Sequence, residues 1–168
     1  MLINGASGAV GIYAVQLAKY YGAEVTGVCS AGNAGLVRKA GADFIIDYTQ
    51  EDFMKAGKAY DVVFDAVGKR SFSACKRVLT AKGIYLTTVP KLSIVIQMMW
   101  TSLFKGKRAA FATAGLMQNK ANLAFLMELA ESGTLSAVID RRYPLELLPD
   151  AHKYVETERK RGNVIITF

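Results

Sequence analysis

The chain has 168 residues, of which 52% are hydrophobic and 21% charged, and its formal net charge is +7. This length supports one domain with a substantial core, and the composition excludes a disordered or solenoid protein. The longest apolar stretch, residues 93–104, is shorter than the roughly 20 residues that cross a membrane, so we expect a buried or interface helix there and no membrane partner.

The charge distribution and the number of metal-binding residues exclude further classes of function. Basic residues are scattered, and the one cluster, at residues 159–161, lacks interleaved aromatic residues. This favours a solvated helix end over a nucleic-acid interface. Two cysteines, Cys29 and Cys75, and one histidine, His152, cannot supply a zinc cluster, so we expect no metal. Few cysteines and no visible secretory leader predict a cytoplasmic protein.

Strands and helices alternate along the chain. Strands are predicted, in chain order, at residues 2–4, 24–29, 44–47, 62–64, 84–89 and 108–114. Helices are predicted at residues 10–21, 33–40, 50–55 (weakly), 71–82, 93–104 and 147–158. This alternation predicts an α/β fold, a doubly wound (Rossmann) and mostly parallel six-stranded sheet with helices on both faces. The first strand has almost no residues before it, so we expect the chain to be cut from a longer protein.

The stretch NGASGAVG, residues 4–11, joins the first strand to the first helix. It is a near match to the dinucleotide-binding glycine pattern. Gly8 would let the backbone approach a pyrophosphate, and Gly11 would let the helix pack closely on the strand. The amino terminus of the helix would face the anion with free N–H groups. The loop is therefore predicted to hold phosphate.

The end of the second strand indicates which nucleotide is bound. NAD-binding chains usually place Asp or Glu there, about 20 residues past the glycines, whereas this chain has Cys29 followed by Ser30. Ser30 and Asn33 could donate hydrogen bonds to a 2′-phosphate, which favours NADP (NADPH) over NAD. The same two residues could instead cap the following short helix.

Four segments carry a resemblance to a known family: residues 3–30, 41–53, 60–72 and 138–168. Together they resemble the cofactor domain of the medium-chain dehydrogenase/reductases, in the zinc-independent, quinone-oxidoreductase-like branch. The resemblance implies pyrophosphate at the glycine loop, 2′-phosphate at the second strand's end, adenosine at Tyr48, and nicotinamide near the fourth and fifth strands. The implied cofactor-binding residues are Ser7, Gly8, Ala9, Val10, Ser30, Asn33, Tyr48, Ala66, Val67, Thr87 and Thr88.

The chain departs from that family in one large respect. Members begin with a GroES-like catalytic domain, which is missing from this sequence. We therefore predict an NADP-binding Rossmann domain over residues 1–136 and a segment over residues 137–168 that would return to the missing domain. That segment would leave Leu145 and Leu147 exposed or in a swapped contact.

Several single residues have two interpretations. Tyr48 could contact the cofactor or only cover the end of the third strand. Asp65 is expected to cap the loop after the fourth strand rather than act as a catalytic acid. Cys75 is expected in the core, and His152 on a helix surface rather than as a base. We assign no catalytic residue.

We compare three classes of function. An NADPH-dependent reductase of quinone or enone carbonyl compounds would need no acid or base from this chain, since bound water or solvent can supply the proton. A short-chain dehydrogenase of the extended type needs Tyr-x-x-x-Lys, which is absent from the sequence. The alternative is a nucleotide-binding domain that turns nothing over without its substrate half.

The sixth predicted strand, at residues 108–114, is apolar and lacks proline. As the sheet edge it would leave backbone groups open to pairing. With residues 93–104 beside it, we expect a homodimer through this edge, in which a two-fold axis pairs each strand with its own copy.

Overall fold

The computed structural model describes residues 1–112 and 119–168. Its main sheet has six parallel strands in the order β3-β2-β1-β4-β5-β6. The strands are β1 (Leu2–Asn4), β2 (Thr26–Cys29), β3 (Phe44–Asp47), β4 (Tyr60–Asp65), β5 (Leu79–Thr87) and β6 (Arg108–Phe111). The order reverses between β1 and β4, which is the switch point of a doubly wound sheet, so the predicted Rossmann fold is confirmed.

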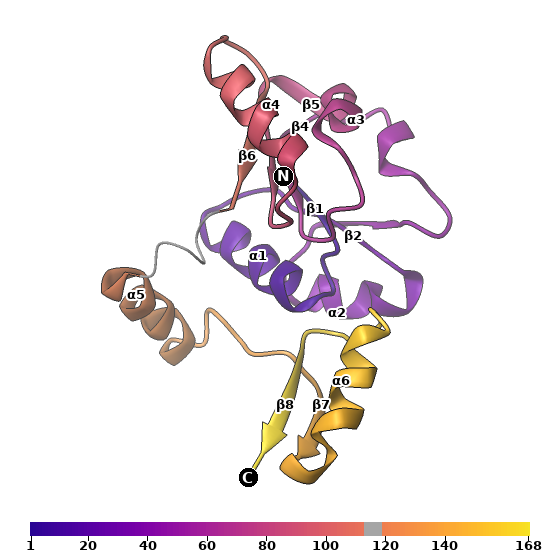
Figure 1. Cartoon of the computed structure of the whole chain (residues 1–168), viewed down its shortest axis with the longest axis vertical. Coiled ribbons are helices and arrows are strands. Elements are labelled where there is room, and N and C mark those ends of the chain that lie inside the picture. The colour runs from indigo at the N-terminus through magenta and orange to yellow at the C-terminus, as the bar shows by residue number, and fades with distance from the viewer. Residues whose placement is uncertain (113–118) are drawn as a thin grey trace.

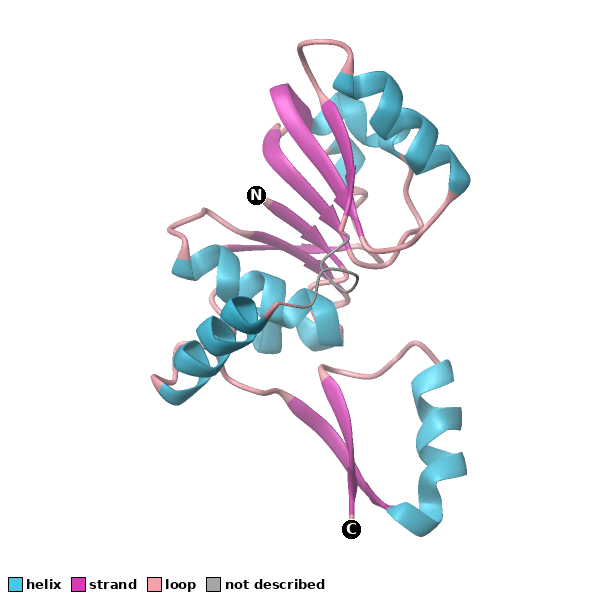
Figure 2. Cartoon of the chain, turned by 60° about the vertical axis from the view of Figure 1, so that its left-hand side comes forward, coloured by secondary structure: helices cyan, strands magenta, loops and turns pink. Residues whose placement is uncertain are grey.

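Helices cover both faces of this sheet, as Figures 1 and 2 show. The helices against the sheet are α1 (Ala9–Tyr20), α2 (Ala34–Lys39), α3 (Phe72–Cys75) and α4 (Leu92–Ser102). α5 (Lys120–Glu131) lies away from the sheet, on the side of α1, where the rings of Tyr20 and Phe125 are 5.8 Å apart. Adjacent residues of β1 enter different cores, because side chains alternate along a strand. Leu2 packs with Phe72 and Ile94, on the side of α3 and α4. Ile3 packs with Ile12 on the opposite face, where Val37 of α2 also lies.

Three predicted elements differ from the structure. The expected helix over residues 71–82 ends early, and β5 already begins at Leu79, because Val78 and Leu79 are buried among the core side chains. β5 then detours through a register shift between Tyr60 and Val62 on its partner strand before it pairs again at Ile84. The weak helix at residues 50–55 is a single 3₁₀ turn, Phe53–Lys55, capped by Asp52. The sixth strand ends at Phe111, and residues 113 and 114 lie outside the described part of the chain.

The expected buried or interface helix at residues 93–104 is present as α4, but most of it is exposed. Only Ile94 and Thr101 of this helix are buried in the described chain. α4 packs on α3 and β6 at the far end of the molecule (Figure 1).

A separate two-stranded parallel sheet follows α5. It consists of β7 (Ile139–Pro144) and β8 (Asn163–Thr167), connected by α6 (Leu148–Glu156). The sequence predicts the helix but not the strand pairing. Two strands and one helix cannot bury both faces of a sheet, and Leu145 and Leu147 are almost half exposed, as expected for this segment.

Candidate nucleotide-binding site

Glycines shape the turn between β1 and α1. Gly5 has a φ of +82°, a backbone conformation that side chains rarely adopt. A Cβ on Gly11 would lie 2.1 Å from the carbonyl oxygen of Gly5 and 2.8 Å from the Cα of Ala6, so no larger residue fits between helix and strand. A Cβ on Gly8 would meet only the oxygen of Gly5, at 3.4 Å. The backbone of Gly8 is therefore accessible from the open side of the loop.

The amino terminus of α1 lies at this open side. Gly8 is the residue that begins the helix, and no side chain caps it or supplies an acid in the first turn. The first N–H groups of a helix have no partner within it, and they carry the positive end of the helix dipole. Backbone donors and positive potential at one point are suited to bind an anionic group.

A cavity of about 1030 Å³ lies in front of the loop, at the carboxyl ends of β1, β2 and β4. Parallel α/β sheets bind their ligands at this position. Nine of the eleven predicted cofactor-binding residues line the cavity: Ser7, Gly8, Ala9, Val10, Ser30, Asn33, Tyr48, Ala66 and Val67. Tyr48 is 63% exposed at the cavity, so its ring is not part of the core.

The end of β2 differs in detail from what the sequence suggests. The side chain of Cys29 is only 2% exposed and packs in the core near Ile3, and burial raises the pKa of its thiol. Ser30 is the first residue after β2 whose side chain is partly exposed at the cavity. The amide of Asn33 donates a hydrogen bond to Oγ of Ser7, 3.2 Å away, and neither Ser30 nor Asn33 caps a helix through its side chain. Asn33 thus ties the glycine loop to the β2–α2 turn.

Thr87 and Thr88 do not line this cavity. The hydroxyl of Thr87 donates to the backbone oxygen of Asp65 and accepts the N–H of Val89. Thr87 also borders a smaller neighbouring cavity of about 180 Å³, whereas Thr88 borders neither cavity. In the described chain, neither Thr87 nor Thr88 therefore faces the space in front of the glycine loop.

Asp65 is a buried structural carboxylate at the end of β4. One oxygen accepts the side-chain amide of Asn4 at 2.9 Å and the N–H groups of Val67 and Gly68. The other accepts the hydroxyl of Tyr85 at 2.9 Å and the N–H of Arg70. Burial, with the carboxylate beside it, raises the pKa of the Tyr85 phenol. These bonds confirm that Asp65 caps the loop after β4.

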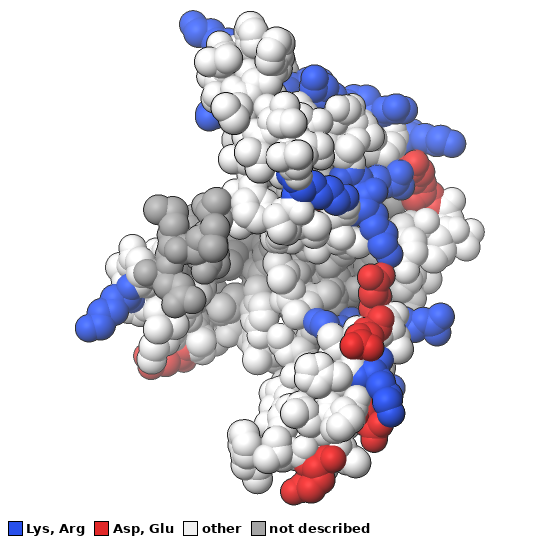
Figure 3. Space-filling view, viewed as in Figure 1, with Lys and Arg blue, Asp and Glu red and all other residues white. Residues whose placement is uncertain are grey.

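The remaining cavity wall is basic, which the sequence did not reveal. Lys69 and Arg70 follow β4, and residues 159–161 follow α6, so five basic side chains line the cavity together with three acidic ones, Glu51, Asp52 and Glu158. Ion pairs join Lys69 to Glu158 at 2.9 Å and Arg70 to Asp52 at 3.1 Å. Figure 3 shows blue and red atoms along this side of the molecule.

The solvated helix end expected at residues 159–161 is present, because Arg159 and Arg161 are exposed soon after α6, but these residues also lie beside the glycine loop. The N–H of Gly162 donates to the oxygen of Ser7 at 2.9 Å, and Gly162 forms an isolated parallel bridge with Gly8. This pairing brings the basic residues to the glycine loop, although they are about 150 residues away in sequence. Partial burial lowers the pKa of Lys160. The only sequence signal was a basic triplet directly before an apolar strand.

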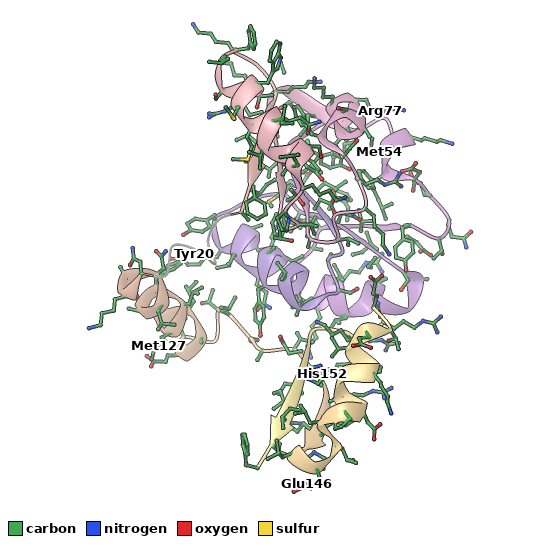
Figure 4. All side chains as sticks on the ribbon, viewed as in Figure 1. Tyr20, Met54, Arg77, Met127, Glu146 and His152 are labelled. Carbon is green, nitrogen blue, oxygen red and sulfur yellow. The ribbon has the colours of Figure 1, made fainter. Side chains whose placement is uncertain are left out.

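Two other expectations concern reactive side chains. Cys75 lies in the core, as predicted, and burial raises the pKa of its thiol to about 12. His152 lies on α6, in the unit with β7 and β8 (Figure 4), and its exposed side chain does not line the cavity. Within residues 1–112 and 119–168, no cluster of His, Cys, Asp or Glu could hold a metal ion. None of the helices described there has the length and hydropathy to span a membrane.

The fold, the glycine loop and the cavity define a Rossmann-type dinucleotide-binding domain. A family model described as zinc-binding dehydrogenase matches residues 40–166. The chain belongs to the medium-chain dehydrogenase/reductase family, in its quinone-oxidoreductase-like part. Despite the name of the family model, the described residues do not assemble a zinc site.

Similar proteins agree with this assignment. The mouse NAD(P)H oxidoreductase RTN4IP1, mitochondrial, is 32% identical over 98% of this chain and 47% of its own length. The chloroplast envelope quinone oxidoreductase homolog of Arabidopsis thaliana is 31% identical over 99% of this chain and 51% of its own. A quinone oxidoreductase structure from Coxiella burnetii has a TM-score of 0.84 at 28% identity, covering 99% of this chain and 52% of its own.

Two facts follow from these relatives. The chain spans about half the length of the curated relatives it matches. The expectation of a cytoplasmic protein is wrong, because these relatives are named as mitochondrial or chloroplast proteins, among them the chloroplastic quinone-oxidoreductase QR1 of Triphysaria versicolor.

Proposed function

We propose that this chain is the cofactor-binding part of an NADPH-dependent oxidoreductase that reduces a quinone or enone carbonyl compound. One observation carries the proposal: the uncapped amino terminus of α1 and the accessible backbone of Gly8 border a cavity whose five basic side chains outnumber its three acidic ones. Such a wall suits the several negative charges of a dinucleotide phosphate. The names of the relatives support nicotinamide-dependent reduction.

Each cavity region has a proposed role. Residues 7–10 hold the pyrophosphate by their backbone, while Ser30 and Asn33 bind the 2′-phosphate and Tyr48 lies against the adenosine. Ala66 and Val67 border the nicotinamide side. When bound, the reduced nicotinamide supplies a hydride, and this chain's residues only bind and orient it. A contact from Thr87 or Thr88 stays a prediction.

The two sheets are the basis of a proposed domain division. Residues 1–136 form the cofactor domain, and residues 137–168 belong with the GroES-like catalytic part that the family resemblance implies. The half-exposed Leu145 and Leu147 support this division, because a folded protein usually covers such a pair. By itself the chain is expected to bind NADPH, whereas turnover requires the catalytic part.

The cofactor preference is tested at Ser30. The neighbouring substitution Cys29→Asp is unsuitable, because it would bury a carboxylate in the core. Ser30→Asp places a negative charge where the 2′-phosphate is proposed to lie. We expect NADPH affinity, measured by calorimetry, to fall at least tenfold (about 1.4 kcal/mol), with little change for NADH. The matched control is Ser73→Asp, on an exposed position of α3 outside the cavity. Equal affinities of the wild-type chain for both nucleotides would refute the NADPH assignment.

We also propose a homodimer through the edge formed by β6. β6 is the last strand in the sheet order, which leaves its outer side without a strand partner in the described chain. The hydroxyl of Thr101 already accepts the N–H of Ala109, so pairing is expected at Phe111 rather than along the whole strand. Light scattering should give a dimer that Ala112→Lys converts to a monomer. A wild-type monomer at high concentration would refute this interface.

A further inference from the structure

One side of α4 is a continuous row of large exposed apolar side chains. The residues recur at intervals of three and four, which places them on a single helix face. They are between 48% and 79% exposed. We call this row, together with the two residues that directly follow the helix, the α4 stripe: Leu92, Val95, Ile96, Met99, Trp100, Leu103 and Phe104.

The α4 stripe has no cover within the described chain. The opposite side of the helix anchors it, since Ile94 is buried and Thr101 bonds to β6. Within the stripe, the rings of Trp100 and Phe104 lie 5.4 Å apart and shield each other only partly. Soluble proteins rarely expose so many large apolar groups together unless another surface binds there.

The charge around the α4 stripe has one sign. From residue 66 to residue 127 the sequence contains ten Lys and Arg and no Asp or Glu, although the whole chain is only +7. The rest of the chain is therefore net negative. The atoms around α4 that carry charge are blue in Figure 3, at the end of the molecule opposite β7 and β8.

The basic residues lie at both ends of the helix. Lys91 directly precedes α4, and Lys105, Lys107 and Arg108 follow it. Nζ of Lys107 donates to the backbone oxygen of Lys76, which places the 3₁₀ turn after α3 beside this end. Lys105, Lys107 and Arg108 form no ion pair within the described residues.

We propose that the α4 stripe and its basic rim dock on the surface of an anionic lipid bilayer. An amphipathic helix with Trp, Phe and Leu on one face and cationic residues at its margin lies in the bilayer interface and is attracted to acidic headgroups. α4 has 11 residues, enough to lie on a membrane but not to cross it. This proposal replaces the expectation of no membrane partner, which considered only spanning segments.

Charge complementarity selects the bilayer over a second copy of the chain. Two copies that joined through their α4 stripes would bring two acid-free basic regions together, and like charges in contact oppose association. Acidic headgroups instead supply the missing opposite charge. The α4 stripe shares no residue with β6, so the pairing proposed at Phe111 does not itself require the stripe.

Trp100 makes a direct test possible because it is the only tryptophan in the chain and is 66% exposed. Its emission is measured with phosphatidylcholine vesicles, with and without phosphatidylserine, and with lipids brominated on their acyl chains. We expect a blue shift and bromine quenching with the acidic vesicles, and at least about tenfold weaker binding to phosphatidylcholine alone. Added salt should weaken the binding.

Variants distinguish vesicle binding through the α4 stripe from non-specific hydrophobic adsorption of the chain. Met99→Glu should weaken binding to acidic vesicles at least tenfold, because it places a charge within the α4 stripe. The double variant Lys82→Glu with Lys105→Glu should weaken binding as much, because it reverses two basic charges beside the stripe. Lys82 lies next to Ala81, whose oxygen is near Gly106 in the turn after α4. The matched control is Leu123→Glu on α5, also exposed and apolar, which should bind as the wild type does.

Three outcomes would overturn the proposal. The first is the absence of bromine quenching with acidic vesicles, and the second is an equal loss of binding in Leu123→Glu. The third is a dimer, seen by light scattering, that Met99→Glu converts to a monomer while vesicles leave Trp100 emission unchanged. That result would assign the α4 stripe to a second copy of the chain.

Discussion

Gly8 and Gly11 occupy the same loop, yet different surroundings require them. Gly11 is confined by the chain itself, because its missing Cβ would overlap the backbone of residues 5 and 6. Gly8 has room on its cavity side, so any need for glycine there comes from a ligand. A motif that looks uniform in sequence therefore combines a packing requirement with a binding requirement.

This difference predicts that one alanine substitution mainly lowers stability and the other mainly weakens cofactor binding. Gly11→Ala should lower the free energy of unfolding by at least about 2 kcal/mol, because α1 must move away from β1. Gly8→Ala should cost less than about 1 kcal/mol as a helix start, but should weaken NADPH binding at least about tenfold. Denaturant unfolding and calorimetry measure the two quantities, and similar stability losses in both variants would contradict this account.

At the scale of elements, α1 holds the carboxyl-terminal segment through two side chains, Gln16 and Tyr13. The Gln16 amide donates to the oxygen of Ser136 at 3.1 Å and accepts its N–H at 2.7 Å. This pair of bonds precedes β7, where the chain leaves the main sheet. The hydroxyl of Tyr13, one turn earlier, accepts a bond from the side chain of Asn163 at 2.9 Å.

Gln16→Leu is therefore expected to loosen the second sheet without unfolding the first. Each lost bond is worth about 1 kcal/mol, so amide hydrogens of β7 and β8 should exchange roughly tenfold faster or more, while those of β1 and β4 keep their rates. Gln50→Leu, in an exposed turn, is the control. Uniform acceleration across both sheets would mean that they unfold as one unit.

At the scale of the whole molecule, the cavity is built with residues from the parts of the chain around both sheets. The fold of the main sheet, in contrast, does not depend on the second sheet. The described core clusters are built almost entirely from residues before position 136. Three of the five basic side chains on the cavity wall come from after position 156.

Removal of residues 137–168 should therefore separate folding from binding. The shortened chain is expected to unfold cooperatively but to bind NADPH at least about tenfold more weakly, since three cationic side chains leave the cavity. Thermal unfolding and calorimetry measure this. A shortened chain without a cooperative transition would show that the proposed division at residue 136 is wrong.

The sequence by itself determined the alternation of strands and helices, the parallel sheet and the glycine loop. These features follow from spacings of two to four residues and from local glycine geometry. For the same reason, α6 could be predicted, but its flanking strands could not be paired. The start of β5 was missed because burial of Leu79, a tertiary effect, outweighed a helical local pattern.

Only the tertiary structure decided which side chains reach the candidate site. Cys29 and Ser30 are neighbours in sequence and both line the cavity, but the side chain of Cys29 is buried in the core whereas that of Ser30 is partly exposed. Residues 159–161 join that wall because Gly162 pairs with the glycine loop, and α4 keeps an apolar face exposed because nothing in the described part of the chain covers it. Contacts between distant segments depend on how whole elements pack, and no local spacing in the sequence encodes that packing.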